Sequence, residues 1–132
     1  MAAGLVLAAT LLWPPLTVGA AEGDSPAKAM YLKYCSACHG SGGKGDGVVS
    51  GFLRPKPTDL TQIAKKTKGE FPFMETAQAI DGTRTIRAHG DSDMPVWGEL
   101  FREESTAPLT RQAEVRGKVM LITDYLRSIQ EK

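Results

Sequence analysis

Apolar residues recur at helical spacing near the end of the chain. Within residues 110–130 they step by four, three, four and three positions, which places them on one helix face: Val115, Val119, Ile122, Leu126 and Ile129. We predict that this stripe and the adjacent Met120 pack into the core. Gly117 either permits close contact with the first helix or is tolerated at a cost of about 1 kcal/mol relative to alanine. Tyr125 is expected to pack over the crossing of the two helices.

A second helical pattern begins at residue 25. Ser25 and Pro26 suit a helix N-cap and the first helical position. Apolar residues follow at three- and four-residue steps up to Cys35: Ala27, Met30, Tyr31 and Tyr34. Five glycines within residues 40–47 predict a loop. This loop is not a phosphate-binding P-loop, because Asp46 stands where a lysine is required.

Two shorter helices are predicted in the middle of the chain. One begins after Asp59 and carries three apolar residues, Leu60, Ile63 and Ala64. The other is closed by Gly82 and carries Phe73, Ala77 and Ile80. We expect both to form walls of a ligand pocket.

The composition fits a single domain. Of 132 residues, 16 are Lys or Arg and 15 are Asp or Glu, which gives a formal net charge of +1. A charge so close to zero argues against a nucleic-acid partner or a polybasic membrane contact. Aromatic residues make up only 7% of the chain, so the core must depend on aliphatic side chains, methionines and a bound group.

The first 21 residues carry no charged side chain. Their apolar stretch, residues 5–13, is followed by Pro14 and Pro15, and residues 18–21 offer cleavage sites before and after Ala21. We predict a signal peptide over residues 1–21. The alternative is an uncleaved membrane anchor, although a spanning helix of about 20 residues would have to include both prolines. In both cases the domain of residues 22–132 is expected to be exported, which suggests a periplasmic location.

Both cysteines lie in the segment "YCSACHGSGGKGDG", residues 34–47. A structural zinc site would need a fourth ligand, and the only other histidine, His89, would give an unfamiliar spacing. A thioredoxin-like dithiol would need a βαβ setting, and a disulfide between Cys35 and Cys38 would be strained. The remaining interpretation is C-x-x-C-H, the attachment motif of haem c. Two thiols three positions apart face one porphyrin edge, and the next residue, His39, ligates the iron.

The passage "RPKPTDLT", residues 54–61, is stiffened by two prolines. It is either a rigid surface connection or a strut beside the histidine, and we favour the strut. In that case a carbonyl near Pro55 or Pro57 accepts the other imidazole N–H and fixes the ring.

Iron bound by one histidine has a second axial position, and the thioether of one of the five methionines is a suitable ligand for it. Met94 stands in "HGDSDMPVWGE", where Pro95 fixes a backbone dihedral and helps to hold the sulfur in place. We predict that Met94 is the ligand and that Met74, in the apolar "FPFME", forms part of the pocket wall. His89 is the rival ligand, although we expect it to be a loop or surface residue. Trp97 is either a pocket wall whose N–H reaches a haem propionate or a core aromatic.

These segments, with the terminal "DYLRSIQ", resemble the small class I c-type cytochromes over about residues 25–130. The resemblance implies an all-α fold in which the N- and C-terminal helices cross and one covalently bound haem c lies in a hydrophobic cleft with one edge exposed. It also implies that Cys35 and Cys38 carry the thioether bonds and that His39 and Met94 are the axial iron ligands. The uncharged export segment and its proline pair depart from the common pattern.

Iron held by two protein ligands has no vacant position for a substrate, so the expected function is one-electron transfer and not catalysis. The protein would link a dehydrogenase or respiratory complex to a terminal acceptor, with redox proteins as donor and acceptor. It would contact a membrane only if the N-terminal segment is retained. Two alternatives stay open: a dedicated cytochrome subunit of a larger redox enzyme complex, and a five-coordinate ligand-binding haem protein.

Overall fold

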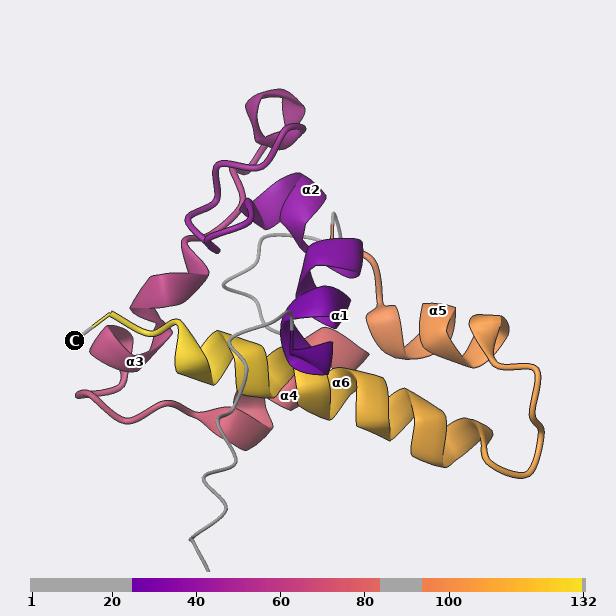
Figure 1. Ribbon diagram of the computed structural model, residues 1–132. Coiled ribbons are helices and arrows are strands. Elements are labelled where there is room, and N and C mark those ends of the chain that lie inside the picture. The colour runs from indigo at the N-terminus through magenta and orange to yellow at the C-terminus, as the bar shows by residue number, and fades with distance from the viewer. Residues whose placement is uncertain (1–24, 84–93, 132) are drawn as a thin grey trace, which may run out of the picture.

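The computed structural model describes residues 25–83 and 94–131, and all regular structure in these two ranges is helical (Figure 1). The elements are, in order, α1 (Pro26–Tyr34), α2 (Ser36–His39), η1 (Ser50–Phe52), η2 (Leu60–Gln62), α3 (Ile63–Lys66), α4 (Phe73–Asp81), α5 (Trp97–Glu104) and α6 (Arg111–Ser128), where η marks a 3-10 helix. The prediction of an all-α fold is thus confirmed for the described ranges. The predicted export segment, residues 1–21, lies outside them.

The first helix begins where its sequence predicts. The Ser25 hydroxyl accepts a hydrogen bond from the Lys28 backbone N–H at 3.2 Å, and Pro26 takes the first helical position. Tyr31 is the fully buried residue of α1. The helix ends at Tyr34, and Cys35 is its C-cap, whose N–H still bonds the Tyr31 carbonyl. The cysteine motif therefore begins directly at the end of a packed helix.

The last helix, α6, is the centre of the core. It packs against α1, α4 and α5, and Figure 1 shows α1 lying across it. Four residues of the predicted stripe are buried and the fifth, Ile129, is half-buried. Met120 packs against the same core, as predicted. The rings of Tyr31 and Tyr125 lie 4.7 Å apart between centroids, which confirms that Tyr125 packs over the crossing of α1 and α6.

Gly117 does not serve a close helix contact. It is exposed, and no atom lies within 4 Å of the position that a side chain would occupy there. Of the two interpretations offered by the sequence, close packing against the first helix is therefore wrong. The glycine is tolerated because this part of α6 faces solvent.

The two short middle helices have the predicted boundaries. Asp59 caps the first, because its carboxylate accepts from the Thr61 N–H at 2.9 Å. This helix begins as the 3-10 turn η2 and continues as α3. The second, α4, ends at Gly82, which takes the left-handed conformation (φ 79°) of a helix C-cap.

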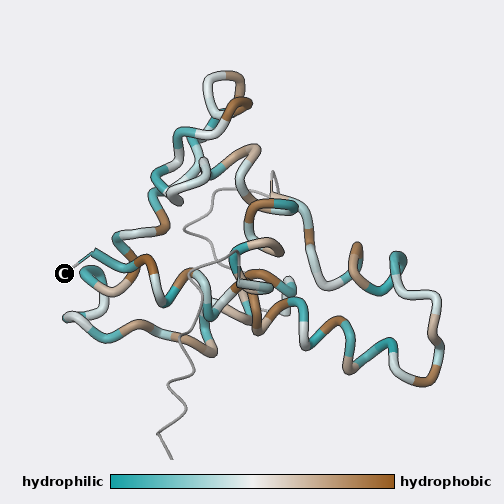
Figure 2. The backbone as a smooth tube through the Cα atoms, viewed as in Figure 1, coloured by the Kyte–Doolittle hydropathy of each residue, from teal (hydrophilic) through white to brown (hydrophobic). Residues whose placement is uncertain are grey.

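Apolar residues are also found away from the core. Figure 2 shows hydrophobic positions at the turn around η1, which protrudes from the rest of the molecule. Val48 and Phe52 in this turn are 86% and 88% exposed. None of the helices in the described ranges has the length and apolar character needed to cross a membrane.

Replacing Gly117 with alanine is expected to stabilise the protein. Alanine is the better helix former, and the added methyl group meets no neighbour. Gly117→Ala should therefore raise the free energy of unfolding by about 1 kcal/mol. Urea unfolding followed by circular dichroism measures this change, and a lower free energy of unfolding would contradict the prediction.

Candidate functional site

Three segments far apart in the sequence surround one pocket. They are the end of α1 with α2, the extended passage before η2, and the segment that leads into α5. The cavity has a volume of about 150 Å³, and of about 790 Å³ when the open space at its mouth is included. All four predicted site residues line it: Cys35, Cys38, His39 and Met94.

The two cysteines lie on one tight helical turn. Cys35 caps the end of α1 and Cys38 lies within α2, and the N–H groups of Cys38 and His39 both bond the Cys35 carbonyl, at 3.2 and 2.9 Å. Both side chains are free thiols, and both face the same pocket. The spacing therefore produces the arrangement that it predicts, with two thiols and an imidazole directed to one cavity.

The environment of Cys35 does not suit thiol–disulfide exchange. Burial, and to a smaller extent the neighbouring Cys38 thiol, raises the pKa of Cys35 to about 12. Only the thiolate attacks a disulfide, and redox-active cysteines have lowered pKa values. In the folded chain Cys35 thus stays protonated at neutral pH, which weakens the dithiol interpretation of the motif.

The glycine loop closes over the carbonyl groups at the end of α2. Gly45 N–H bonds the His39 carbonyl at 2.8 Å, and Gly47 N–H bonds the Cys38 carbonyl at 3.1 Å. Gly47 approaches so closely that a Cβ atom there would overlap the Ala37 carbonyl. The buried Tyr31 hydroxyl donates to the Gly40 carbonyl at 2.6 Å. The loop thereby satisfies the last carbonyls of the helix and holds His39 in place.

The histidine is oriented by the extended passage. His39 is only 8% exposed, and its Nδ1 lies 2.9 Å from the Thr58 carbonyl oxygen. Since a carbonyl only accepts, Nδ1 carries the proton, and Nε2 is then the nitrogen suited to bind a metal. The interpretation of residues 54–61 as a strut beside the histidine is confirmed. The accepting carbonyl belongs to Thr58, directly after Pro57.

The segment around Met94 is held through α5. Met94 is half-buried and lines the pocket together with Pro95 and Trp97. The centroid of the Trp97 ring lies 5.5 Å from that of Tyr34 and 5.8 Å from that of Phe101. The ring centroids of Tyr34 and Phe101 lie 4.9 Å apart. Trp97 is therefore both a pocket wall and a packed aromatic, so the two interpretations from the sequence do not exclude each other. Its contact with a haem propionate stays a prediction.

A polar contact fixes the far end of α5. The Glu104 carboxylate accepts from the Tyr34 hydroxyl and from the Lys118 ammonium, both at 2.8 Å. It thus joins α5 to α1 and α6. The hydrogen bond from Lys118, followed by that from Tyr34, lowers the pKa of Glu104.

Two expectations about the pocket walls are wrong. Met74 does not line the pocket and is 53% exposed, because α4 turns its buried face, Thr76, Ala77 and Ile80, toward the core and not toward the cavity. Neither α3 nor α4 contributes a described pocket residue. This part of the wall is formed instead by Leu53 and by residues of the strut such as Pro55. An apolar residue directly before a proline-rich passage was the available signal for Leu53.

His89 lies outside the described residues, so its role stays a prediction. Within the described residues, no group of three or more His, Cys, Asp or Glu side chains is arranged to hold a metal ion. No family model, no curated protein and no solved structure matches the chain. The pocket residues themselves are therefore the basis on which a function is assigned.

Glu104 is expected to stabilise the fold in a pH-dependent way. Its folded-state pKa lies below the ordinary 4.5, so its contribution is present above that pH and is lost as the pH falls through the folded-state value. Glu104→Gln should lower the free energy of unfolding at pH 7 by at most about 1 kcal/mol, because the group is partly screened by solvent. Urea unfolding at pH 7 and pH 3 should give a smaller difference at pH 3. The adjacent exposed Glu103→Gln is the control, and an equal loss at both pH values would contradict the prediction.

Gly98 is expected to be required for the position of α5. A Cβ atom at Gly98 would overlap the Asp81 carbonyl at the end of α4, so α5 would have to move away. Gly98→Ala should lower the free energy of unfolding by about 1–3 kcal/mol despite the better helix propensity of alanine. Gly117→Ala is the matched control, since it makes the same change at an open site of α6. Urea unfolding of both variants checks the opposite signs, and stabilisation by both would contradict the close contact.

Proposed function

We propose that the protein is a one-electron carrier that holds a single covalently bound haem c. The observation that carries this proposal is the meeting of Cys35, Cys38, His39 and Met94 on one pocket, although 55 positions separate His39 from Met94. Two thiols, an imidazole and a thioether are the four groups that a His/Met-ligated haem c requires.

The residues present fit this group. Cys35 and Cys38 would form the thioether bonds, His39 Nε2 would be one axial ligand and the Met94 sulfur the other. When bound, the haem supplies an iron that changes oxidation state by one electron. The Thr58 carbonyl orients the imidazole and increases its basicity by accepting from Nδ1. Leu53, Pro55, Pro57 and Trp97 line the same cavity and would form an apolar wall that limits the access of water to the bound group.

The arrangement of helices supports assignment to the class I cytochrome c fold. The N-terminal helix of the described domain packs on the C-terminal helix, and the cysteine motif follows directly from the first of them. The extended strut and the segment that carries Met94 also line the cavity. From this arrangement we infer the class I cytochrome c fold, which the resemblance of the sequence also implies.

Electron exchange is the chemistry that such a haem would supply if His39 and Met94 both bound its iron, because no position would remain for a substrate. We further propose that the protein is exported to the periplasm, where it receives electrons from a dehydrogenase or respiratory complex and passes them to a redox partner. Arg54 and Lys56 are exposed on the passage that borders the pocket, and Lys56 lines its mouth. A docking partner would meet cationic side chains there, and their effect would be local because the net charge is +1.

Intact mass and the absorption spectrum of protein from its native host test this proposal together. We expect the mass of the chain plus one haem, a low-spin spectrum, and the far-red methionine-to-iron charge-transfer band in the ferric form. Met94→Ala should abolish this band because the thioether is lost. Met74→Ala is the matched control, since Met74 is exposed and does not line the pocket.

Three outcomes would contradict the proposal or part of it. Native protein without a covalently bound tetrapyrrole would refute it altogether. A charge-transfer band that survives Met94→Ala would refute the ligand assignment. Rapid binding of carbon monoxide to the wild-type ferrous protein without displacement of a ligand would favour the five-coordinate haem protein instead.

A further inference from the structure

The chain directly after α6 binds the segment that follows Thr58, the residue whose carbonyl bonds His39. The side-chain amide of Gln130 donates from Nε2 to the Leu60 carbonyl at 2.8 Å, and its Oε1 accepts from the Ala64 N–H at 2.8 Å. The same Nε2 also donates to the Leu126 carbonyl at 2.7 Å, which fixes the amide to the end of α6. One half-buried side chain therefore joins both ends of the segment 60–64 to α6.

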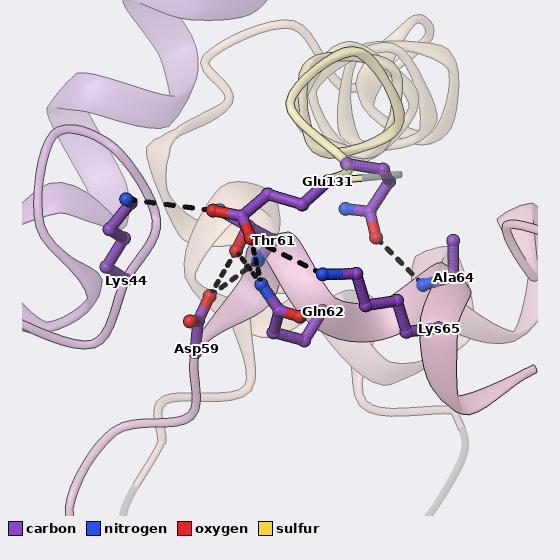
Figure 3. A network of polar contacts seen from close by, with 8 residues as sticks. Lys44, Asp59, Thr61, Gln62, Ala64, Lys65 and Glu131 are labelled. Atoms are coloured by element: carbon purple, nitrogen blue, oxygen red, sulfur yellow. Dashed lines mark hydrogen bonds and ion pairs between the residues drawn. The ribbon is translucent and has the colours of Figure 1, made fainter. Parts of the chain in front are cut away.

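Glu131 adds a second set of contacts beside the first. Its backbone N–H donates to the Thr61 carbonyl at 3.0 Å, and its carboxylate accepts from Gln62 Nε2 at 2.8 Å. Figure 3 shows this carboxylate between the ammonium groups of Lys44 and Lys65, which lie at 3.6 and 3.5 Å. The three charged side chains are 45–60% exposed, so their ion pairs contribute little in water. We name Gln130 and Glu131 together the C-terminal clamp.

The contacts of the clamp continue to the carbonyl that bonds His39. Leu60, whose carbonyl binds Gln130, donates its N–H to the Gly43 carbonyl at 2.6 Å. Asp59 is held by Thr61, whose N–H and hydroxyl donate to one carboxylate oxygen at 2.9 and 2.6 Å. Thr58 directly precedes these two residues and follows the rigid Pro57. Its carbonyl has little freedom while Leu60 is docked.

We propose that Gln130 is a positioning residue for His39, acting through the Thr58 carbonyl. The inference rests on the proposed function, in which His39 binds iron through Nε2. A histidine ligand that donates its other N–H to a fixed acceptor is a stronger electron donor, and its ring is held in one orientation. Gln130 keeps that acceptor in place from a position 91 residues further along the chain than the ligand.

Within the C-terminal clamp, the side chain of Gln130 makes the contacts that hold the segment 60–64. Its amide uses both its donor and its acceptor atoms on backbone groups of α6 and the segment 60–64. The Glu131 side chain is mostly a surface group, and its loss is expected to be screened by solvent. Removing the amide leaves the Leu60 carbonyl and the Ala64 N–H without their partner, which loosens the strut at its end.

The experiment compares the wild-type holoprotein with Gln130→Ala and two controls. Gln112→Ala removes an exposed glutamine from the start of α6, and Val115→Ala lowers global stability at the end of α6 away from the strut. The first readout is the deuterium exchange of the His39 Nδ1–H, followed by NMR of the ferric form. The second is the one-electron equilibrium with a fixed redox couple.

For Gln130→Ala we expect the His39 Nδ1–H to exchange about tenfold faster than in wild type. We also expect the redox equilibrium to shift about threefold toward the ferrous form, because an imidazole that donates less charge stabilises ferric iron less. Gln112→Ala should behave as wild type in both readouts. Val115→Ala should leave the equilibrium unchanged. Wild-type values for Gln130→Ala, or an equal shift of the equilibrium in Val115→Ala, would overturn the positioning role.

The wild-type protein shows whether the proposed function fails independently of the role of Gln130. If it carries no covalent haem, the assignment as an electron carrier fails. The orientation of His39 is then measured in the haem-free chain by nitrogen NMR of the ring, where wild type should show the Nδ1-protonated tautomer. Gln130→Ala should increase the Nε2-protonated tautomer, and an unchanged tautomer would overturn the action of Gln130 on His39.

Discussion

The packing of α1 across α6 is the contact on which the rest of the structure depends. Tyr31 is completely buried between these helices, stacks against Tyr125 and bonds the Gly40 carbonyl. The same side chain therefore joins the two helices and holds the start of the loop behind His39. Since α4 and α5 pack on α6 as well, the cysteine motif and the Met94 segment are positioned against one common element.

The two sides of the pocket are held by separate contacts. On the histidine side, Thr58 accepts the imidazole N–H, and its strut is docked on the C-terminal clamp. On the methionine side, α5 depends on the close approach of Gly98 to α4 and on the aromatic packing of Trp97. The two sets share no residue, although the segments that they hold border the same cavity.

Local signals in the sequence predicted most of the fold. The caps at Ser25, Asp59 and Gly82 act within a few residues, and so does the apolar stripe of α6. The sequence also predicted the four residues that line the pocket and a carbonyl beside the prolines. It could not predict contacts between distant segments. Apolar neighbours made Met74 resemble a wall residue, but the packing of α4 exposes it, and nothing local marks Gln130 as a partner of Leu60.

The hydrogen bond between Gln130 and Leu60 spans 70 positions of the chain. A nascent chain that has left the ribosome only as far as α5 contains both thiols, yet it lacks the helix against which α1 packs and the amide that docks the strut. Contacts of such long separation form after local helices, because closing a long loop costs entropy before the contact is made. An enzyme that modifies Cys35 during synthesis would therefore meet an accessible thiol, whereas one that acts on the finished fold would find it buried.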